Sequence, residues 1–512
     1  MIQTYFTRSE KITVGALALT TFFIHIIVNV QGGYGLFRDE LYYIACTNHL
    51  DWGYVDQPPF SIYLLKLSRL ILGDSLVAIR FIPALLHGLL IVITALIVKE
   101  IKGNHFAVFI ACIAMMVSVI HQAMGEYYSM NIIDIFIWAL TFYLLVKIIN
   151  TRKNSLWIWL GIILGIGLLN KISVLFLGAG IFAGLLLTDR TWFTTRWPYM
   201  AGTIAFTLFL PYIIWNINHD MAHLEFIHNA SAGKYADRTA LDFIKEQLLL
   251  INPINIPFWL CGLGVLLFYK PLHSYRILAW VYITAFLILV FNKTSKGEYL
   301  APAYVTLMAG AGVFLEQKLT TSYSRWVRYV YPALMIISLI ALLPMVMPVL
   351  SEEHYISYSE SLGVKPSSSE NKELSELPQF YADMHGWQSK ARDVAAVYNT
   401  LSEEDKAKCA IYSNNYGRCG AIDFYGEQYG LPKSIGSHNN YYLWGSRNYK
   451  GEVMIILGGT MDDHRDDFES CQKVATSSCK YCMPYENNLS IFLCRGLKFN
   501  LKEAWPSLKH YE

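Results

Sequence analysis

The segment 37–60, FRDELYYIACTNHLDWGYVDQPPF, places four acidic side chains and two adjacent prolines in a chain that is otherwise strongly apolar. Two of the acids, Asp39 and Glu40, are neighbours. A carboxylate within reach of a hydroxyl can remove its proton as a general base. Acids in the first turn of a helix also complement the helix dipole, which is the structural alternative for this pair. The alternative is favoured for Asp56, which precedes the prolines as an N-cap would.

Further charged residues occur within or beside apolar segments of the sequence. Ionisable groups inside membrane-spanning segments are costly, and they are usually functional or paired. Several of them are predicted at one depth, near the acidic loop, which indicates a cavity open to the outer leaflet. The candidates are Arg80, Glu126, Asp134, Lys171, Lys293, Lys296 and Glu298.

The composition indicates a polytopic membrane protein. Of 512 residues, 54% are hydrophobic and 16% are charged, whereas soluble domains carry about 25% charged residues. The net charge of +2 and the lack of a long basic run give no indication of a nucleic-acid partner. About eleven stretches approach the length of a membrane span. They are 11–31, 76–98, 104–121, 129–149, 155–170, 173–188, 198–216, 252–269, 277–292, 300–316 and 328–349.

Lysine and arginine in alternate short connections set the orientation, because such residues are enriched on the cytoplasmic side. With residue 1 in the cytoplasm, the first loop (32–75) and residues 350–512 lie outside. Residues 39–49 and 60–72 have helical spacing with one apolar side, so both are predicted to lie along the outer membrane surface. The chemistry is therefore expected at the extracytoplasmic face.

The C-terminal region has a different pattern. Residues 351–375 are rich in Ser and Glu and are predicted to form a linker. Residues 376–512 combine a helical pattern at 386–402 with short apolar runs at 409–413, 452–459 and 489–494, which predicts a small α/β domain. Its six cysteines indicate two or three disulfides. A zinc site using Cys479, Cys482, Cys471 and Cys494 is the alternative.

Several motifs resemble one family of membrane enzymes. RDELYYIA, DWGYVDQPPF and SLVAIRFIPAL look like the start of the GT-C glycosyltransferases of family 39, which include protein O-mannosyltransferases and the lipid A aminoarabinose transferase. SMNIIDIFIWAL, GLLNKISVLF and KGEYLAPAYVTLMAGAG resemble later motifs of that family, over about residues 10–350. The C-terminal region resembles the soluble domain of a bacterial subgroup.

This resemblance implies a GT-C catalytic domain at 1–350 and transfer of a sugar, with inversion, from a polyprenyl-phosphate donor to a hydroxyl or phosphate acceptor on a lipid, glycan or protein. It requires no metal cofactor, although the need for a divalent ion is left open. Asp39 takes the position of the base, with Glu40 beside it. The remaining substrate-binding candidates are Asp134, Glu126, Arg80, Lys171, Lys296, Tyr299, Tyr42 and Tyr43. Gln57 departs from the lysine of the lipid A enzyme type, so aminoarabinose is not implied.

Two other classes of protein compete with an enzyme. A transporter or flippase for a lipid-linked sugar would also carry charges within its spans, but transporters often contain a repeated half, and the sequence shows none. A receptor or structural role accounts for the C-terminal region but not for Asp134. P-loop and dinucleotide-binding fingerprints are absent from the sequence, which gives no support to soluble nucleotide-sugar binding.

Overall fold

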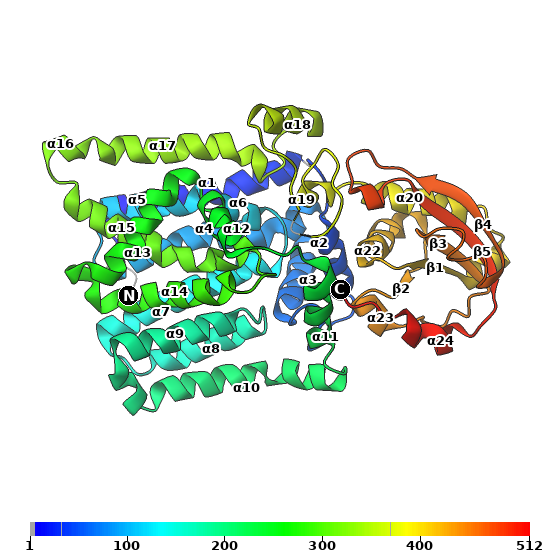
Figure 1. Cartoon of the computed structure of the whole chain (residues 1–512), viewed down its shortest axis with the longest axis horizontal. Helices are drawn as coiled ribbons and strands as arrows, with labels where there is room; N and C mark the ends of the chain where they lie inside the picture. The colour runs from blue at the N-terminus through cyan, green and yellow to red at the C-terminus, as the bar shows by residue number, and fades with distance from the viewer. Residues whose placement is uncertain (1–5, 32, 369) are drawn as a thin grey trace. The chain divides into compact units, whose positions relative to one another are not determined.

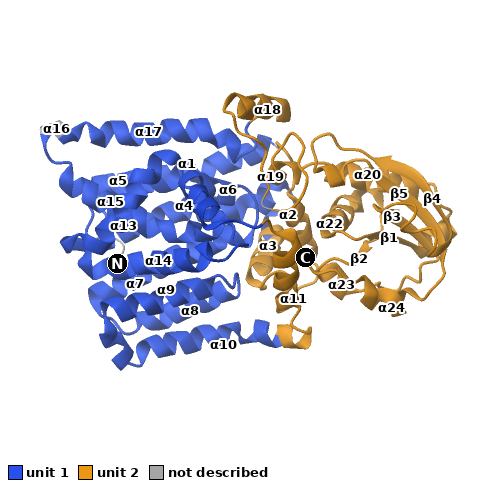
Figure 2. Ribbon diagram, viewed as in Figure 1, with its two compact units in different colours: residues 1–32, 71–214, 237–349 blue, residues 33–70, 215–236, 350–512 orange. Residues whose placement is uncertain are grey.

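The computed structural model describes residues 6–31, 33–368 and 370–512. Residues 1–5, predicted to be cytoplasmic, and residue 32, the predicted start of the first loop, lie outside the described residues. The chain forms two compact units (Figure 2). Unit 1 comprises 1–32, 71–214 and 237–349, and unit 2 comprises 33–70, 215–236 and 350–512. Residues 33–70 of the first loop therefore belong to the same compact unit as the C-terminal region.

Helices make up nearly all of unit 1. Within the described residues, seven are long and apolar enough to cross a membrane. These seven are α1 (Arg8–Gln31), α4 (Leu76–Glu100), α7 (Met130–Thr151), α10 (Trp197–Asn218), Lys270–Val290 with α14 (Arg276–Val290), Gly297–Lys318 with α15 (Tyr304–Lys318), and Val327–Met345 with α17 (Val327–Leu342). The protein is therefore a multi-pass membrane protein.

Two further apolar segments are sharply bent. Helices α5 (His105–Met116) and α6 (Val119–Glu126) meet at 61°, and α12 (Ala240–Leu250) meets Pro253–Phe268, which contains α13 (Ile256–Phe268), at 98°. Asn252, with a φ of 82°, and Pro253 interrupt the second pair. Counting each pair as one span gives up to nine. The predicted eleven would also require the shorter helices α8 (Leu156–Leu168) and α9 (Val174–Thr188) to cross, so the number of spans stays a prediction.

Glycine allows helices of unit 1 to pack at short range. A Cβ atom on Gly180 of α9 would lie 2.9 Å from Val281 Cα of α14, and one on Gly184 would lie 2.6 Å from Ile277 Cγ1. Small residues at such interfaces are typical of membrane helices, which gain stability from close packing where the hydrophobic effect is weak. The packing of unit 1 thus agrees with its composition.

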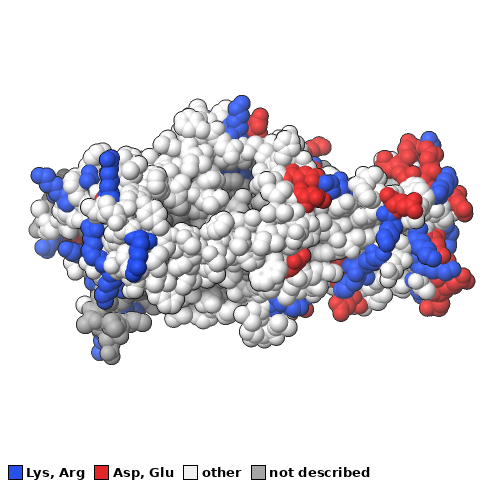
Figure 3. All heavy atoms as spheres, turned by 90° about the horizontal axis from the view of Figure 1, so that it is seen from below, with Lys and Arg blue, Asp and Glu red and all other residues white. Residues whose placement is uncertain are grey.

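Charged side chains are unevenly spread over the surface of unit 1. Lysine and arginine gather at the end that carries α16 (Ser322–Arg325), whereas the flank seen in Figure 3 is nearly free of charge. An uncharged flank bounded by cations is what a bilayer requires of a protein that crosses it.

Unit 2 contains the helices of the first loop, the short helix of 215–236 and a five-stranded sheet. The first loop supplies α2 (Arg38–Cys46) and α3 (Phe60–Leu72), of which residues up to 70 belong to this unit. The other helices are α11 (Ala222–Asn229), α18 (Glu352–Ser361), α19 (Gln379–Ala382), α20 (Trp387–Tyr398), α21 (Glu403–Lys408), α22 (Tyr416–Tyr425), α23 (Asn440–Trp444) and α24 (Leu501–Ala504). Helix α18 occupies part of the segment that the sequence predicts as a linker.

The sheet has the strand order β2-β1-β3-β5-β4. Strands β2 (Ile435–Gly436), β1 (Cys409–Ser413) and β3 (Val453–Leu457) are parallel, and β5 (Leu489–Leu497) and β4 (Phe468–Ser477) complete the sheet as antiparallel strands. Helices α20 and α22 pack against it (Figure 1). The predicted α/β fold is confirmed, and the three predicted apolar runs are β1, β3 and β5.

One disulfide joins Cys471 on β4 to Cys494 on β5, at directly paired positions of the sheet. The expectation of disulfides in the C-terminal region is confirmed for this pair. The other four cysteines of that region (Cys409, Cys419, Cys479 and Cys482) are not disulfide-bonded, so the expected second and third bridges are not formed. A zinc site that uses Cys471 and Cys494 as thiolate ligands is excluded, because their sulfur atoms are joined.

Candidate active site

The residues that the sequence selects for chemistry fall into two groups, one in each unit. Unit 2 holds Asp39, Glu40, Tyr42 and Tyr43, and unit 1 holds Arg80, Glu126, Asp134, Lys171, Lys296 and Tyr299. The contacts of each group are described within its own unit.

Asp39 is the second residue of α2, which begins at Arg38. Its side chain is 31% exposed. One carboxylate oxygen, Oδ1, accepts a hydrogen bond from Tyr416 OH at 2.8 Å and lies 3.4 Å from Arg38 Nε. Among the described residues, no side chain or backbone group donates to the other oxygen, Oδ2. A carboxylate with one oxygen fixed by a hydrogen bond and the other without a donor is well suited to accept a proton.

Glu40 has a different role in the same helical turn. Its side chain is fully buried, and Oε2 accepts a hydrogen bond from the backbone N–H of Phe37 at 2.8 Å, which caps the start of α2. Of the two acids, Glu40 therefore caps the helix, and Asp39 does not. Glu40 stays a candidate for positioning Asp39 through the helix that they share.

Tyr416 reaches Asp39 because α22 begins at that residue. The Asn415 side chain accepts hydrogen bonds from the backbone N–H groups of Gly417 and Arg418, and this N-cap fixes where the helix starts. A Cβ atom on Gly420 would lie 2.9 Å from the carbonyl carbon of Leu41, so α22 packs directly on the backbone of α2. Tyr416 is not among the residues selected from the sequence, although Asn415 as N-cap and the glycines Gly417 and Gly420 indicate a helix start that packs closely on another segment.

Arg38, the first residue of α2, forms ion pairs with several acids. Its buried guanidinium lies 3.4 Å from carboxylate oxygens of both Glu370 and Asp383, and Nη1 donates to Tyr485 OH at 2.9 Å. Burial raises the pKa of Asp383 to about 7, although the positive charge of Arg38 opposes that rise. Sequence reasoning missed this network because Arg38 lies far along the chain from both Glu370 and Asp383.

Asp56 does not cap α3, which corrects the expectation from the sequence. That helix begins only at Phe60, so Pro58 and Pro59 precede it and do not form its first turn. The Asp56 carboxylate instead accepts a hydrogen bond from Tyr42 OH at 2.9 Å. Tyr42 is fully buried and Tyr43 nearly so, so both hold α2 in place. Burial raises the pKa of Asp56 to about 7.

The raised pKa of Asp56 predicts a pH-dependent stability. A carboxyl that titrates near 7 when folded and near ~3.9 when unfolded binds its proton more tightly in the native state, so the free energy of unfolding falls as pH rises through this range. In Asp56→Asn we expect a smaller fall in Tm between pH 5 and pH 8 than in the wild type. Scanning fluorimetry measures this, with the exposed Asp462→Asn as control; equal slopes for Asp56→Asn and the wild type would contradict the assignment.

In unit 1, Lys171 lies in the short connection between α8 and α9. Its ammonium donates to Asn131 Oδ1 at 2.7 Å and lies 4.7 Å from the centre of the Tyr299 ring. The buried Asp134 attracts it and accepts a hydrogen bond from Ser173 Oγ at 2.9 Å. Because an ammonium has three N–H donors, two of those of Lys171 have no hydrogen-bond partner within the described residues. Lys171 could therefore bind a phosphate.

The remaining candidates of unit 1 lie in other networks. Arg80, buried on α4, donates to Asn29 Oδ1 at 3.0 Å. Glu126, buried at the end of α6, lies 2.8 Å from His25 Nδ1, and His25 Nε2 lies 2.9 Å from His87 Nδ1. Both histidines therefore take part in a buried hydrogen-bond network with Glu126. Lys296 directly precedes the 3-10 helix η5 (Gly297–Ala303), which carries Tyr299.

In the described part of the chain, no three His, Cys, Asp or Glu side chains lie close enough together to hold a metal ion. Cations that could bind a charged substrate group lie in each unit, Lys171 in unit 1 and Arg38 in unit 2. Considered separately, Asp39 can remove a proton and Lys171 can bind an anion.

The fold has solved counterparts. The structure is similar to the crystal structures of ArnT from Cupriavidus metallidurans, in the apo state and bound to undecaprenyl phosphate, with a TM-score of 0.60 and 12% identity over 94% of this chain and 97% of the other. The protein therefore has the GT-C fold, the fold class predicted from the sequence.

Similarities in sequence agree with this fold. Residues 56–215 match the family described as dolichyl-phosphate-mannose-protein mannosyltransferase. The lipid A galacturonosyltransferase RgtD of Rhizobium johnstonii is 24% identical over 283 residues, which cover 54% of this chain and 59% of that protein. The chain thus spans about three fifths of the length of this relative. The resemblance to GT-C glycosyltransferases is confirmed.

Proposed function

We propose that the protein is an integral-membrane glycosyltransferase that moves a sugar from a polyprenyl-phosphate donor to a hydroxyl acceptor. The observation that carries the proposal is the carboxylate of Asp39. Its Oδ1 accepts a hydrogen bond from Tyr416, whereas its Oδ2 accepts none from the described residues. The GT-C fold and the glycosyltransferases among the similar proteins support it. They give no support to the transporter or flippase that the sequence left as an alternative.

The reaction follows from the charges of the candidate residues. Asp39 Oδ2 takes the proton of the acceptor hydroxyl, and the oxygen forms a bond to the anomeric carbon of the sugar as the bond to the phosphate oxygen breaks. A single displacement of this kind inverts the anomeric carbon. The polyprenyl phosphate leaves with an added negative charge, which a cation can stabilise, and Lys171 is the candidate for this role. Asp39 then loses its proton to water.

The proposed acceptor is a lipid, glycan or protein on the extracytoplasmic side. The distribution of lysine and arginine among the connections supports this side, as does the cationic end of unit 1 in Figure 3. A lipid acceptor is favoured by the relative RgtD, which is described as acting on lipid A.

Transfer is tested with the purified full chain in proteoliposomes. Donors are polyprenyl phosphates that carry a radiolabelled hexose, pentose or uronic acid, and the acceptors are a membrane glycolipid fraction and a protein fraction. We expect label to move from at least one donor to the glycolipid and polyprenyl phosphate to be released in equal amount. Folded protein that transfers from none of these donors, or that moves intact donor across the bilayer, would contradict the proposal.

A further inference from the structure

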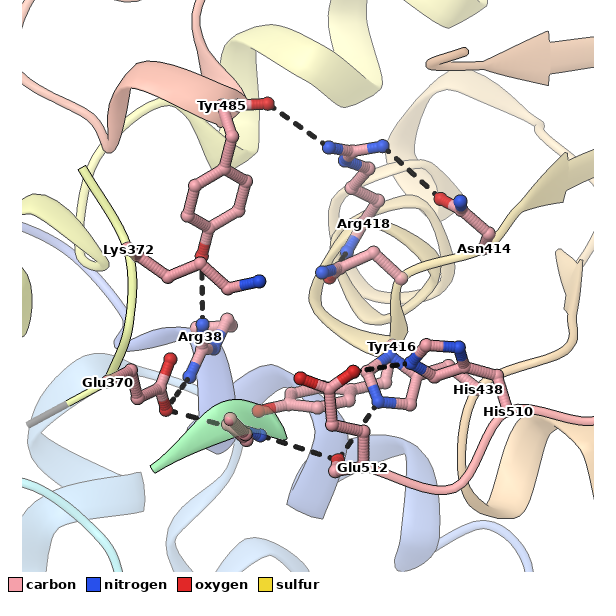
Figure 4. Close-up of a pocket in the computed structure, with 12 residues that line it drawn as sticks. Arg38, Glu370, Lys372, Asn414, Tyr416, Arg418, His438, Tyr485, His510 and Glu512 are labelled. Atoms are coloured by element: carbon pink, nitrogen blue, oxygen red, sulfur yellow. Dashed lines mark hydrogen bonds and ion pairs between the residues drawn. The ribbon is translucent and has the colours of Figure 1, made fainter. Parts of the chain in front are cut away.

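Unit 2 contains a cavity of about 210 Å³ beside the N-terminus of α2 (Figure 4). Pockets for drug-sized ligands enclose ~300–1,000 Å³, so this one fits a smaller polar group. Of its lining residues, four are Lys or Arg, two are Glu and two are His. The cations are Arg38, Lys234, Lys372 and Arg418. The polar lining indicates a charged ligand.

Three of these cations are already paired with acids of the protein, and one of them is Lys234, whose Nζ lies 4.0 Å from a carboxylate oxygen of Glu370. Both Glu486 oxygens lie 3.0 Å from Arg418 Nε, in a buried pair. Arg38 is paired with Glu370 and Asp383. These contacts fix the two guanidinium groups in the cavity wall before any ligand arrives, and they reduce the positive charge that remains for it.

Lys372 is the cation whose charge is not balanced. It is exposed, and within the described residues its ammonium forms no ion pair. Its contact in the cavity is with the ring of Tyr485, 5.9 Å from the ring centre. Figure 4 shows Lys372 and Tyr485 on the same side of the cavity as Arg38. An anion bound there would pair with Lys372 without displacing an acid of the protein.

His438 supplies a hydrogen-bond acceptor, whereas the cations of the cavity are donors. It is buried, and its Nε2 lies 3.1 Å from a main-chain oxygen of Glu512, to which it donates. Burial lowers the pKa of His438 well below its ordinary value, so the ring is neutral and Nδ1 is an acceptor. Among the described residues, Nδ1 has no hydrogen-bond partner. A buried acceptor of this kind suits a ligand hydroxyl.

We propose that this cavity binds an anionic sugar of the acceptor, meaning a sugar that carries a phosphate or carboxylate group. Lys372 binds the anionic group, and His438 Nδ1 accepts a hydroxyl. Two residues link the cavity to the proposed base, because Arg38 and Tyr416 line it and both contact Asp39 Oδ1. The assignment to the acceptor rests on the proposed function, since it takes Asp39 as the base for the acceptor hydroxyl.

Binding is measured by isothermal titration of the full chain in detergent with glucose 6-phosphate, inorganic phosphate and glucose. We expect glucose 6-phosphate to bind more tightly than phosphate, and glucose to show no binding at the same concentrations. Lys372→Gln should weaken glucose 6-phosphate about tenfold, as expected for the loss of a charge-assisted hydrogen bond. The matched control is Lys473→Gln, which removes an exposed lysine of β4 outside the cavity.

Three results of the titration would overturn the cavity as an anionic-sugar site. They are equal affinities for glucose and glucose 6-phosphate, an unchanged affinity in Lys372→Gln, and equal weakening in Lys473→Gln. These measurements require no transfer activity. Failure of the proposed function would therefore leave this test intact.

Steady-state kinetics decide which substrate uses the cavity. With a glycolipid acceptor that carries phosphate, Lys372→Gln should raise the KM for the acceptor about tenfold and leave kcat and the KM for the donor unchanged. An acceptor from which the phosphate has been removed should show a high KM with both proteins. A rise in the KM for the donor alone would assign the cavity to the donor and overturn the proposal.

Discussion

Replacing Asp39 with asparagine is expected to lower the turnover of sugar transfer by about 10²–10⁴-fold, the usual contribution of a general base. Asparagine keeps the shape of the side chain and an oxygen that can accept the hydrogen bond of Tyr416, but it cannot accept a proton from the acceptor. The KM values of donor and acceptor should change little, because the affected step is the chemical one. The measurement is a time course of transfer by folded, monodisperse protein.

The competing explanation for Asp39 is an acid that merely stabilises the start of a helix. That role contributes only ~0.3–1 kcal/mol to stability and nothing to the rate. Glu404→Gln is the matched control, because Glu404 also occupies the second position of a helix, α21, on the surface of unit 2. If Asp39→Asn and Glu404→Gln transferred sugar equally fast, Asp39 would return to the structural role and Asp134 would become the next candidate.

Removing the ammonium of Lys171 in Lys171→Met is expected to lower kcat by about 10²–10³-fold, the loss typical of one group that stabilises developing charge. The leaving polyprenyl phosphate gains negative charge, and the two unused N–H donors of Lys171 are suited to bind it. The donor KM should rise as well, since the phosphate is charged before the reaction. Both constants come from initial rates at varied donor concentration.

Lys171 also interacts electrostatically with the buried Asp134, so a loss of activity could reflect a disturbed fold. Lys171→Arg separates the two explanations, because it keeps the positive charge while changing its geometry. We expect it to retain the Tm of the wild type and to recover part of the activity. Lys153→Gln, which alters an exposed lysine of unit 1, is the surface control. Unchanged kinetics in folded Lys171→Met would remove this residue from the reaction.

Hydrophobic patterning predicted the parts of the fold that are uniformly buried. The strands β1, β3 and β5 stood out as apolar runs because their side chains lie in the core. Strand β4 was missed because most of its side chains are exposed, so FESCQKVATS lacks the pattern of a buried strand. The bends between α5 and α6 and between α12 and α13 were also missed, because hydropathy averages over a segment and does not register its direction.

The candidate site could be proposed from the sequence where residue type and the family resemblance suggest chemistry, as for Asp39, Asp134 and Lys171, whose roles stay predictions. It was not predictable where tertiary contacts decide the role. Tyr416 is 377 positions away from the carboxylate that it holds. Asp56 was assigned to a helix cap because the pattern Asp-Gln-Pro-Pro resembles one, whereas its actual partner, Tyr42, comes from the preceding helix.

Unit 2 is assembled from three stretches of chain that are separated by the helices of unit 1, and this order matters during biosynthesis. At ~5–20 residues per second, the ribosome needs ~20–75 s to advance by the 377 positions between Asp39 and Tyr416. During that interval the first loop is complete in sequence but lacks the helix that packs on α2. A nascent chain of this protein therefore carries an unfinished first loop until translation is nearly over, and Asp39 gains its contact with Tyr416 only in chains that also fold the C-terminal region, which is made late.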